Sequence, residues 1–396
     1  MSISVMSTPV PASSSADTGE MSLIEALGVA IEAADKGSRI IWQCVEKRRI
    51  AMAAAATFHT TSALAAGGAA SVECENKTSA TNLVTQHSKQ CRETIIRILR
   101  QYSEEVQREK PHLRFAFLTE ELNPGTPLSD DYTWVVDPID GAASFVHGLP
   151  DCCISIGLTY RKQPVLAVVF TPFISSGVRL TVAAAAVLNT KMLDEHGTAA
   201  APTTALPPTP PTPPFPSVVP ECNGELFTAI KGFGAFVNGR QVRVNAKVVP
   251  ATSVVVFNHP CGVMLSTAEA ASPEGAAIRR RKCDAAIDCS MAMREELLRL
   301  PVAALRCYGS CAATLAQVAA GRVDAYLEPA GKAWDVCAGS LLVTEAGGVV
   351  CNMLGRPLDM AHDTTIVAAA TQEMADLMTE KCVRHGFGQY WLVEKE

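Results

Sequence analysis

Several acidic residues stand where apolar segments end or where a helical pattern begins. Glu120 and Glu121 follow one apolar segment, and Asp137 ends the next, with Asp140 three residues later. Far along the chain, Asp335 opens a helical pattern. Carboxylate oxygens are hard ligands of the kind that Mg²⁺ prefers. If the fold brings these side chains together, the sequence predicts a magnesium site.

Each of these acidic positions also has an ordinary structural explanation. An Asp-Pro pair is typical of a turn, an aspartate before a helix is typical of a cap, and paired glutamates suit a solvated strand edge. Pro138 is expected to stop both helix and strand. Asp137, the Ile139 carbonyl and Asp140 are then expected to share one tight turn, so the metal interpretation depends on the joint pattern.

The segments around these residues resemble the signatures of the inositol monophosphatase family. Residues 137–148, DPIDGAASFVHG, are similar to the first signature, and residues 334–339, WDVCAG, with 345–348, EAGG, are similar to the second. Residues 119–121, TEE, resemble the Gly-Glu-Glu strand end of the family. The three motifs occur in the family order, and the resemblance covers residues 21–390 apart from insertions.

This resemblance implies a layered αβαβα sandwich and a magnesium-dependent phosphomonoesterase. In this chemistry the metal ions neutralise the phosphate dianion and lower the pKa of the attacking water. The implied metal ligands, whose carboxylates are also the implied catalytic groups, are Glu121, Asp137, Asp140 and Asp335, together with the Ile139 carbonyl.

The resemblance also implies where the substrate binds. Gly141 and Ala142 are expected to offer backbone N–H groups to the phosphate at the start of a helix. The remaining substrate-binding positions implied by the family pattern are Lys77, Gly309, Ser310, Cys311, Glu328 and Asp335.

Two departures from the family pattern fall at the expected nucleophile. The family carries a threonine at the position of Ala142 and an aspartate at the position of Ser88, and this pair orients the attacking water. Such assistance is worth about 100-fold or more in rate. We therefore expect two magnesium ions and phosphate to bind, with a third metal site depleted and turnover slowed, unless Ser144 supplies a hydroxyl.

The leading functional prediction is hydrolysis of myo-inositol monophosphate to inositol and phosphate. Residues 145–148 and the spacing from Glu328 to Asp335 favour the inositol branch over fructose-1,6-bisphosphatase and the nucleotide bisphosphate phosphatases. A sugar-phosphate or histidinol-phosphate phosphatase is an alternative. A different class of protein, a catalytically impaired homologue that binds metal and a phosphorylated polyol, is favoured by Ala142 and Ser88.

Hydrophobic periodicity predicts the elements that must position these residues. Helices are expected at 22–49, 88–106, 312–320, 335–346 and 373–385, and residues 51–71 either extend the first helix or form a loop. Strands are expected at 113–118, 132–136, 154–160, 165–170, 323–328 and 348–352, with a hairpin over 225–244 that turns at Asn238-Gly239. Strands alternating with helices indicate an α/β protein.

The chain divides into a tail, two halves and an insertion. Residues 1–20 are expected to be a mobile tail, 21–250 an α+β metal-binding half and 251–396 an α/β half. Residues 175–223 are rich in proline and favour a polyproline II insertion. We expect a solvated linker there, with a ligand for a proline-recognising domain as the alternative.

Composition excludes several classes of protein. The 396 residues are 48% hydrophobic and 19% charged, which excludes a disordered chain. A net charge of −6 gives no basic surface of the kind that binds nucleic acid or an acidic membrane, and the basic run at 279–282 is expected to be a solvated loop.

The 14 cysteines are dispersed without a Cys-x-x-Cys motif, which favours a reduced cytoplasmic setting. No apolar run is long enough for a membrane span. The family resemblance implies a homodimer.

Overall fold

The computed structural model describes residues 21–57, 74–76, 83–120, 127–174, 224–259, 273–362 and 365–387. Lys77, Glu121, the tail at 1–20 and the proline-rich insertion at 175–223 lie outside the described residues. The predictions made for them stay predictions.

The described residues form helices, most of which begin and end close to the predicted positions. These helices are α1 (Leu23–Thr57), α2 (Gln86–Glu109), α3 (Ala142–His147), α5 (Pro273–Arg299), α6 (Cys311–Ala319), α7 (Ala333–Glu345) and α8 (Gln372–Arg384). The alanine-rich segment after residue 50 extends α1 as far as Thr57, because alanine has the highest helix propensity.

Two larger sheets and a short hairpin contain the strands. The hairpin pairs β1 (Cys74–Asn76) with β2 (Leu83–Thr85). The seven-stranded sheet contains, in spatial order, β3 (Phe115–Thr119), β4 (Tyr132–Asp140), β5 (Cys153–Tyr160), β6 (Gln163–Thr171), β7 (Glu225–Ile230), β8 (Gly234–Val237) and β9 (Arg240–Val242). The five-stranded sheet contains, in spatial order, β11 (Ala304–Arg306), β10 (Val254–Phe257), β12 (Ala325–Glu328), β14 (Ile366–Ala369) and β13 (Val349–Cys351).

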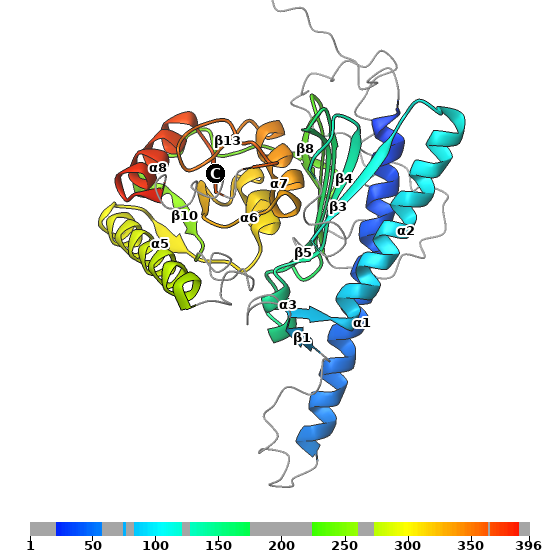
Figure 1. Cartoon of the computed structure of the whole chain (residues 1–396), viewed down its shortest axis with the longest axis horizontal. Helices are drawn as coiled ribbons and strands as arrows, with labels where there is room; N and C mark the ends of the chain where they lie inside the picture. Colours follow the sequence, from blue (N-terminus) through cyan, green and yellow to red (C-terminus); the bar gives the residue numbers. More distant parts are fainter. Residues whose placement is uncertain are drawn as a thin grey trace, which may run out of the picture.

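Helices and sheets stack in five alternating layers (Figure 1). α1 and α2 cover one face of the seven-stranded sheet. α6 and α7 lie between the two sheets, and α5 and α8 cover the outer face of the five-stranded sheet. This αβαβα arrangement confirms the predicted fold class.

The strands are apolar on both faces because each large sheet is covered on both sides. In β4, Trp134 and Val136 pack toward α1 and α2, while Val135 packs toward α6 and α7. In β12, Tyr326 packs into the core between the two sheets, here called the middle core, and Leu327 packs into the core beneath α5 and α8. The alternation follows from the two-residue period of a strand. The middle core contains residues from both predicted halves, and the boundary at residue 250 stays a prediction.

The direction of the strands decides which residues meet. β3 and β4 are parallel, so their carboxyl ends lie at the same edge of the seven-stranded sheet. β5 is antiparallel to β4, which places Cys153 beside Asp140. Ser155 of β5 donates to the Trp334 carbonyl, so the carboxyl end of β4 and the beginning of α7 are neighbours at this edge.

Three sequence predictions about local structure were wrong. β4 does not stop at Pro138 but continues to Asp140, with a register shift against β5 between Asp137 and Asp140 that absorbs the missing N–H. The basic run Arg279–Lys282 belongs to α5 and is not a loop. Asp137, Ile139 and Asp140 lie in β4 and not in one tight turn. Asp335 is the third residue of α7, and its carboxylate does help to cap this helix, since it accepts from the N–H of Lys332 at the cap position.

β10, β11, β14 and α5 were not predicted from the sequence, because no chemical motif marks them. None of the helices in the described part of the chain is both long and apolar enough to cross a membrane.

Candidate metal centre

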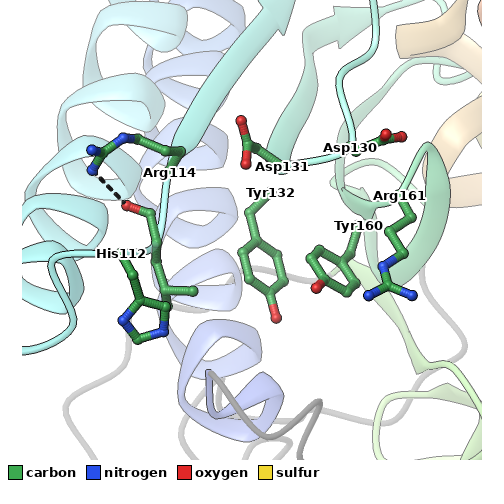
Figure 2. A pocket seen from close by; sticks show the side chains of 8 residues that line it. His112, Arg114, Asp130, Asp131, Tyr132, Tyr160 and Arg161 are labelled. Carbon is green, nitrogen blue, oxygen red and sulfur yellow. Dashed lines mark hydrogen bonds between the residues drawn. The ribbon is translucent and has the colours of Figure 1, made fainter.

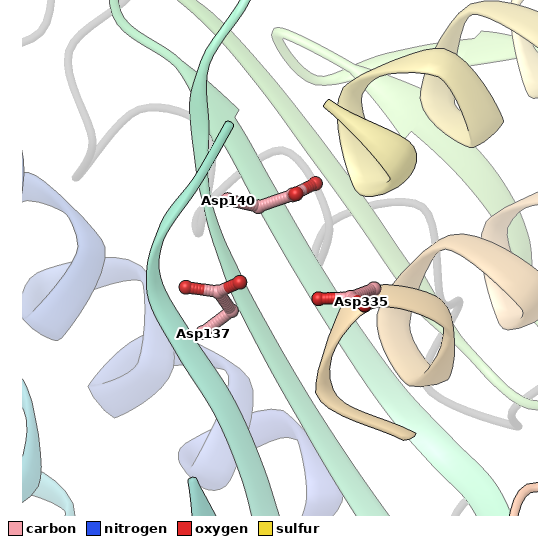
Figure 3. Close-up of side chains that lie close together, drawn as sticks. All are labelled: Asp137, Asp140 and Asp335. Carbon is pink, nitrogen blue, oxygen red and sulfur yellow. The ribbon is translucent and has the colours of Figure 1, made fainter. Parts of the chain in front are cut away.

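Two buried aspartates and one partly buried aspartate converge between β4 and α7 (Figure 3). Asp137 and Asp140 project from the end of β4, and Asp335 projects from the first turn of α7. One carboxylate oxygen from each residue lies within 4.8 Å of those of the other two. Residues 195 positions apart in the sequence thus form one ligand set.

Asp140 is fixed by the beginning of α6. Its Oδ2 atom accepts a hydrogen bond from Ser310 Oγ at 2.7 Å and another from the Ala312 N–H at 2.6 Å. Ser310 is also the cap of α6, since its Oγ accepts from the Ala313 N–H at 3.1 Å. The positive end of a helix favours a nearby carboxylate. α6 therefore orients the Asp140 carboxylate, one oxygen of which belongs to the shared ligand set.

Asp137 and Asp335 are held in the same manner, by one oxygen each. Asp137 Oδ1 accepts from the Ile139 N–H at 3.0 Å, and Asp335 Oδ2 accepts from the Lys332 N–H at 2.8 Å. Among the described residues, the second oxygen of each carboxylate has no hydrogen-bond donor. Three pre-oriented oxygens are thus available to one ion.

The first turn of α7 is docked closely on β5. Ser155 Oγ donates to the Trp334 carbonyl at 3.2 Å, immediately before Asp335. Further along β5, a Cβ atom at Gly157 would lie 2.5 Å from Cys337 Sγ. Glycine at this position lets α7 approach the sheet closely enough for Asp335 to reach the β4 aspartates.

The acid cluster is electrostatically unfavourable without a counter-charge. Burial raises the pKa of Asp137 well above its ordinary value, and the charges of Glu120, Asp140 and Asp335 raise it further. Burial raises the pKa of Asp140 to about 6, although hydrogen bonds from Ser310 and Ala312 oppose this shift. Burial and the Asp140 charge raise the pKa of Asp335 well above its usual range.

These observations fit a divalent cation at the cluster. Three carboxylate oxygens are the donors that a hard ion such as Mg²⁺ takes, and a cation removes the repulsion that raises the aspartate pKa values. Glu120 is close enough that its charge raises the pKa of both Asp137 and Asp335. Glu120 thus adds to the negative potential that a cation would neutralise.

Comparison with known proteins identifies the family of this arrangement. The profile of the inositol monophosphatase family matches residues 42–386. The chain belongs to the inositol monophosphatase family. Inositol monophosphatase 2 of Solanum lycopersicum is 31% identical over 250 residues, which are 63% of this chain and 68% of that protein. Inositol monophosphatase 1 of Solanum lycopersicum is 27% identical over 363 residues, which are 91% and 95% of the two chains.

Solved structures agree on the fold of this inositol monophosphatase family member. The extragenic suppressor protein suhB of Bartonella henselae has a TM-score of 0.58 at 21% identity, covering 90% of this chain and 98% of that one. The inositol monophosphatase TM1415 of Thermotoga maritima has a TM-score of 0.56 at 20% identity, covering 91% and 98%.

The substrate positions that the family pattern implies surround the acid cluster in part. Gly141, with φ of 87°, caps α3, and Ala142 begins it, so the first N–H groups of α3 have no partner inside the helix. Gly309 donates its N–H to Asp151 Oδ2 at 2.6 Å. Ser310 is fully buried against Asp140. Their roles toward a substrate stay predictions.

Glu328 and Cys311 lie in a buried network at the end of β12. Glu328 Oε2 accepts from Tyr326 Oη at 2.6 Å, and Glu328 Oε1 accepts from the Ala330 N–H at 3.1 Å. The charge of Glu328 raises the pKa of both Asp140 and Asp335, so this network borders the acid cluster. Cys311 is buried, and burial raises its pKa well above its ordinary value.

The two departures from the family pattern lie in different helices. Ser88 is buried in the first turn of α2, and Ala142 is the first residue of α3. Ser144, the expected alternative source of a hydroxyl, is buried and packs against Gly309. A Cβ atom added at Gly309 would lie only 2.2 Å from Ser144 Oγ.

Sequence reasoning missed two polar residues near the centre. Asp151 fixes the Gly309 N–H, and Asn258 contacts Glu328 and the Tyr308 peptide. Neither stands in a family signature. The only sequence signal was position, since Asp151 follows a Gly-Leu-Pro turn and Asn258 follows the apolar run of β10.

A separate pocket of about 320 Å³ lies at the opposite end of the seven-stranded sheet (Figure 2). It is lined by residues that precede β3 and β4 and by the turn after β5, including His112, Asp131 and Arg161. Arg161 lies over the Tyr160 ring, 5.3 Å from its centroid. Because the acid cluster lies at the carboxyl end of β4, this pocket lies at the opposite end of the strands.

Proposed function

We propose that this chain is a magnesium-dependent phosphomonoesterase that hydrolyses myo-inositol monophosphate to inositol and phosphate. The observation that carries the proposal is the convergence of Asp137, Asp140 and Asp335, each with one oxygen already oriented. Family membership supports phosphatase chemistry, and several curated relatives are named inositol monophosphatases.

Asp137, Asp140 and Asp335 would hold the metal ions, with Glu121 and the Ile139 carbonyl as further ligands. Magnesium bound there would neutralise the phosphate dianion and lower the pKa of an attacking water. We propose two magnesium ions, with a third site depleted because Ser88 and Ala142 replace the family's polar pair.

The protein's own groups would position the substrate around that centre. The N–H groups at Gly141 and Ala142 would donate to phosphate oxygens at the start of α3. Glu328, at the end of β12, would accept a hydrogen bond from a hydroxyl of the polyol. Gly309, Ser310, Cys311 and Lys77 are the other proposed contacts on the substrate side.

A panel of phosphomonoesters tests this proposal. We expect magnesium-dependent phosphate release from myo-inositol 1-phosphate, and a kcat/KM for it higher than for histidinol phosphate, glucose 6-phosphate or fructose 1,6-bisphosphate. A higher kcat/KM for one of the other esters would assign the chain to a different substrate in the same superfamily.

A second candidate function, binding without turnover, is favoured by Ala142 and Ser88. In this case the chain would bind magnesium and a phosphorylated polyol but release no phosphate. Calorimetric titration of magnesium with and without inorganic phosphate, performed beside the turnover assay, separates the two candidates. Binding of both ligands with no phosphate release from any ester would favour the binding protein.

We also propose a homodimer in the cytoplasm, from the family resemblance and the reduced cysteines. The described cysteines are free thiols, and most of them are buried. The proline-rich insertion at 175–223 is proposed as a linker, with binding to a proline-recognising domain as its alternative role. Light scattering measures the oligomeric state directly.

A further inference from the structure

Asn258 joins three segments that border the acid cluster. It follows β10 directly and is buried at 7% exposure. Its Nδ2 atom donates to Glu328 Oε2 at 2.9 Å, at the end of β12. Its Oδ1 atom accepts from the Tyr308 N–H at 3.0 Å, just before α6. One side chain therefore links the ends of β10 and β12 to the segment that leads into α6.

The two contacts require an amide. The Tyr308 peptide can only donate, so the position needs an acceptor, whereas ionised Glu328 can only accept, so the position needs a donor. Asparagine supplies both in a side chain of this length. An aspartate would keep the hydrogen bond from the Tyr308 N–H and lose the hydrogen bond to Glu328.

The network leaves Glu328 one acceptor position for a ligand. A carboxylate has about four acceptor positions. Asn258 and Tyr326 donate to Oε2, and the Ala330 N–H donates to Oε1, among the described residues. The remaining position lies on Oε1, which can therefore accept from one further hydroxyl.

The same network leads to the acid cluster through the backbone. Tyr308 is followed by Gly309, whose N–H is held by Asp151, and then by Ser310, whose hydroxyl donates to Asp140. Asn258 thus fixes the start of a segment that contacts both the proposed substrate position and a proposed metal ligand.

We propose that Asn258 is a positioning residue for the polyol of the substrate. It orients the Glu328 carboxylate so that Oε1 accepts one hydroxyl of the substrate, and it holds the Tyr308 peptide beside that hydroxyl. This inference rests on the proposed phosphatase function and extends it to a residue outside the family signatures.

The variant Asn258→Asp removes the donor to Glu328 and keeps the acceptor for Tyr308. We expect KM for myo-inositol 1-phosphate to rise about tenfold and kcat to stay within about threefold, because the metal ligands are unchanged. Inhibition by inorganic phosphate, which lacks the polyol, should stay within about twofold. An unchanged KM, or an equal weakening of phosphate inhibition, would overturn the proposal.

The double variant Asn258→Asp with Glu328→Gln restores a hydrogen bond between the two side chains, with the glutamine amide as donor and the aspartate carboxylate as acceptor. Residues that act as one unit show non-additive effects. We expect KM of the double variant to match that of Glu328→Gln alone, whereas additive increases would contradict the proposal. Asn352→Asp is the matched control, because this buried asparagine accepts from the Leu354 and Arg356 N–H groups at the far edge of the same sheet.

Hydrogen exchange at the Tyr308 amide tests the positioning role of Asn258 even if the wild-type protein releases no phosphate. In the magnesium-loaded protein, Asn258→Ala should speed exchange at the Tyr308 amide about tenfold, while Asn258→Asp should leave it within about threefold. Equal exchange in wild type and Asn258→Ala would overturn the positioning role. Faster exchange without any phosphatase activity would instead reject only the proposed function.

Discussion

At the level of single residues, the acid cluster combines carboxylates that are oriented by hydrogen bonds with a shared position for a ligand. One oxygen of each carboxylate accepts hydrogen bonds from the protein, and one oxygen of each lies within 4.8 Å of those of the other two aspartates. Burial of these groups raises their pKa values. An arrangement that destabilises the ionised protein in this way is consistent with a site that acts with a bound cation.

Replacing one of these ligands should abolish most of the activity. We expect Asp140→Asn to lower kcat/KM about 100-fold or more, because loss of a metal ligand removes several kcal/mol of transition-state stabilisation. Asp131→Asn, at an exposed position on the far edge of the sheet, is the matched control and should retain wild-type activity. Equal rates for the two variants in a phosphate-release assay would argue against the site.

Restoring the family's polar pair should raise turnover. We expect Ala142→Thr combined with Ser88→Asp to increase kcat by about tenfold or more, since a water-orienting pair contributes about 100-fold in general acid–base chemistry. Each single variant should gain little, because an aspartate or threonine alone lacks its partner. Steady-state kinetics with saturating magnesium measures the effect, and a double variant no faster than wild type would contradict our explanation of the two departures.

Much of the site could be predicted from the sequence, because metal ligation needs particular residue types. Asp137, Asp140 and Asp335 were predicted and do converge. Asp151 and Asn258 could not be found, since their roles come from contacts between segments distant in the sequence. An asparagine after a strand carries no local signal of the partner that it will meet.

At the element scale, α7 brings its aspartate to β4 by docking on β5. The close approach at Gly157 and the bond from Ser155 to the Trp334 carbonyl fix the beginning of α7. The strongly periodic α2 and the buried strands β4–β6 were predicted well because their patterns are local. β10, β11, β14 and α5 were missed, because the three strands have only three or four residues each and α5 contains a charged run.

Filling the contact between β5 and α7 should weaken both folding and metal binding. A Cβ at Gly157 would lie 2.5 Å from Cys337 Sγ, so Gly157→Ala should cost about 1–3 kcal/mol of unfolding free energy and displace Asp335. Gly28→Ala is the control, because nothing lies within 4 Å of its added Cβ in α1, and it should stabilise by about 0.5–1 kcal/mol. Urea denaturation and magnesium titration measure the two effects, and unchanged values for Gly157→Ala would refute this role of the glycine.

At the scale of the whole molecule, the acid cluster links stability to pH and to metal. The folded pKa of Asp140 is about 6, whereas an unfolded aspartate titrates near 4. Between these pH values the folded, metal-free protein binds more protons at Asp140 than the unfolded chain does. The contribution of Asp140 to the free energy of unfolding is therefore fully present below about pH 4 and is lost as the pH rises toward 6. In the proposed function, magnesium would bind the ionised form and should reverse this loss.

Thermal unfolding across pH therefore tests the linkage. We expect the rise in Tm caused by magnesium to grow from pH 5 to pH 7, and magnesium affinity to fall as pH drops below about 6. In Asp140→Asn the pH dependence should be smaller. A magnesium effect on Tm that stays constant from pH 5 to pH 7 would contradict this linkage between aspartate ionisation and metal binding.

The most direct test of the central claim is the rate of phosphate release from myo-inositol 1-phosphate as a function of magnesium concentration. Convergent carboxylates that hold catalytic magnesium predict no release in the presence of a chelator and a saturable rise in rate when magnesium is added. The same experiment with Asp137→Asn should show almost no rise. Release that is independent of magnesium, or equal in wild type and Asp137→Asn, would contradict the account.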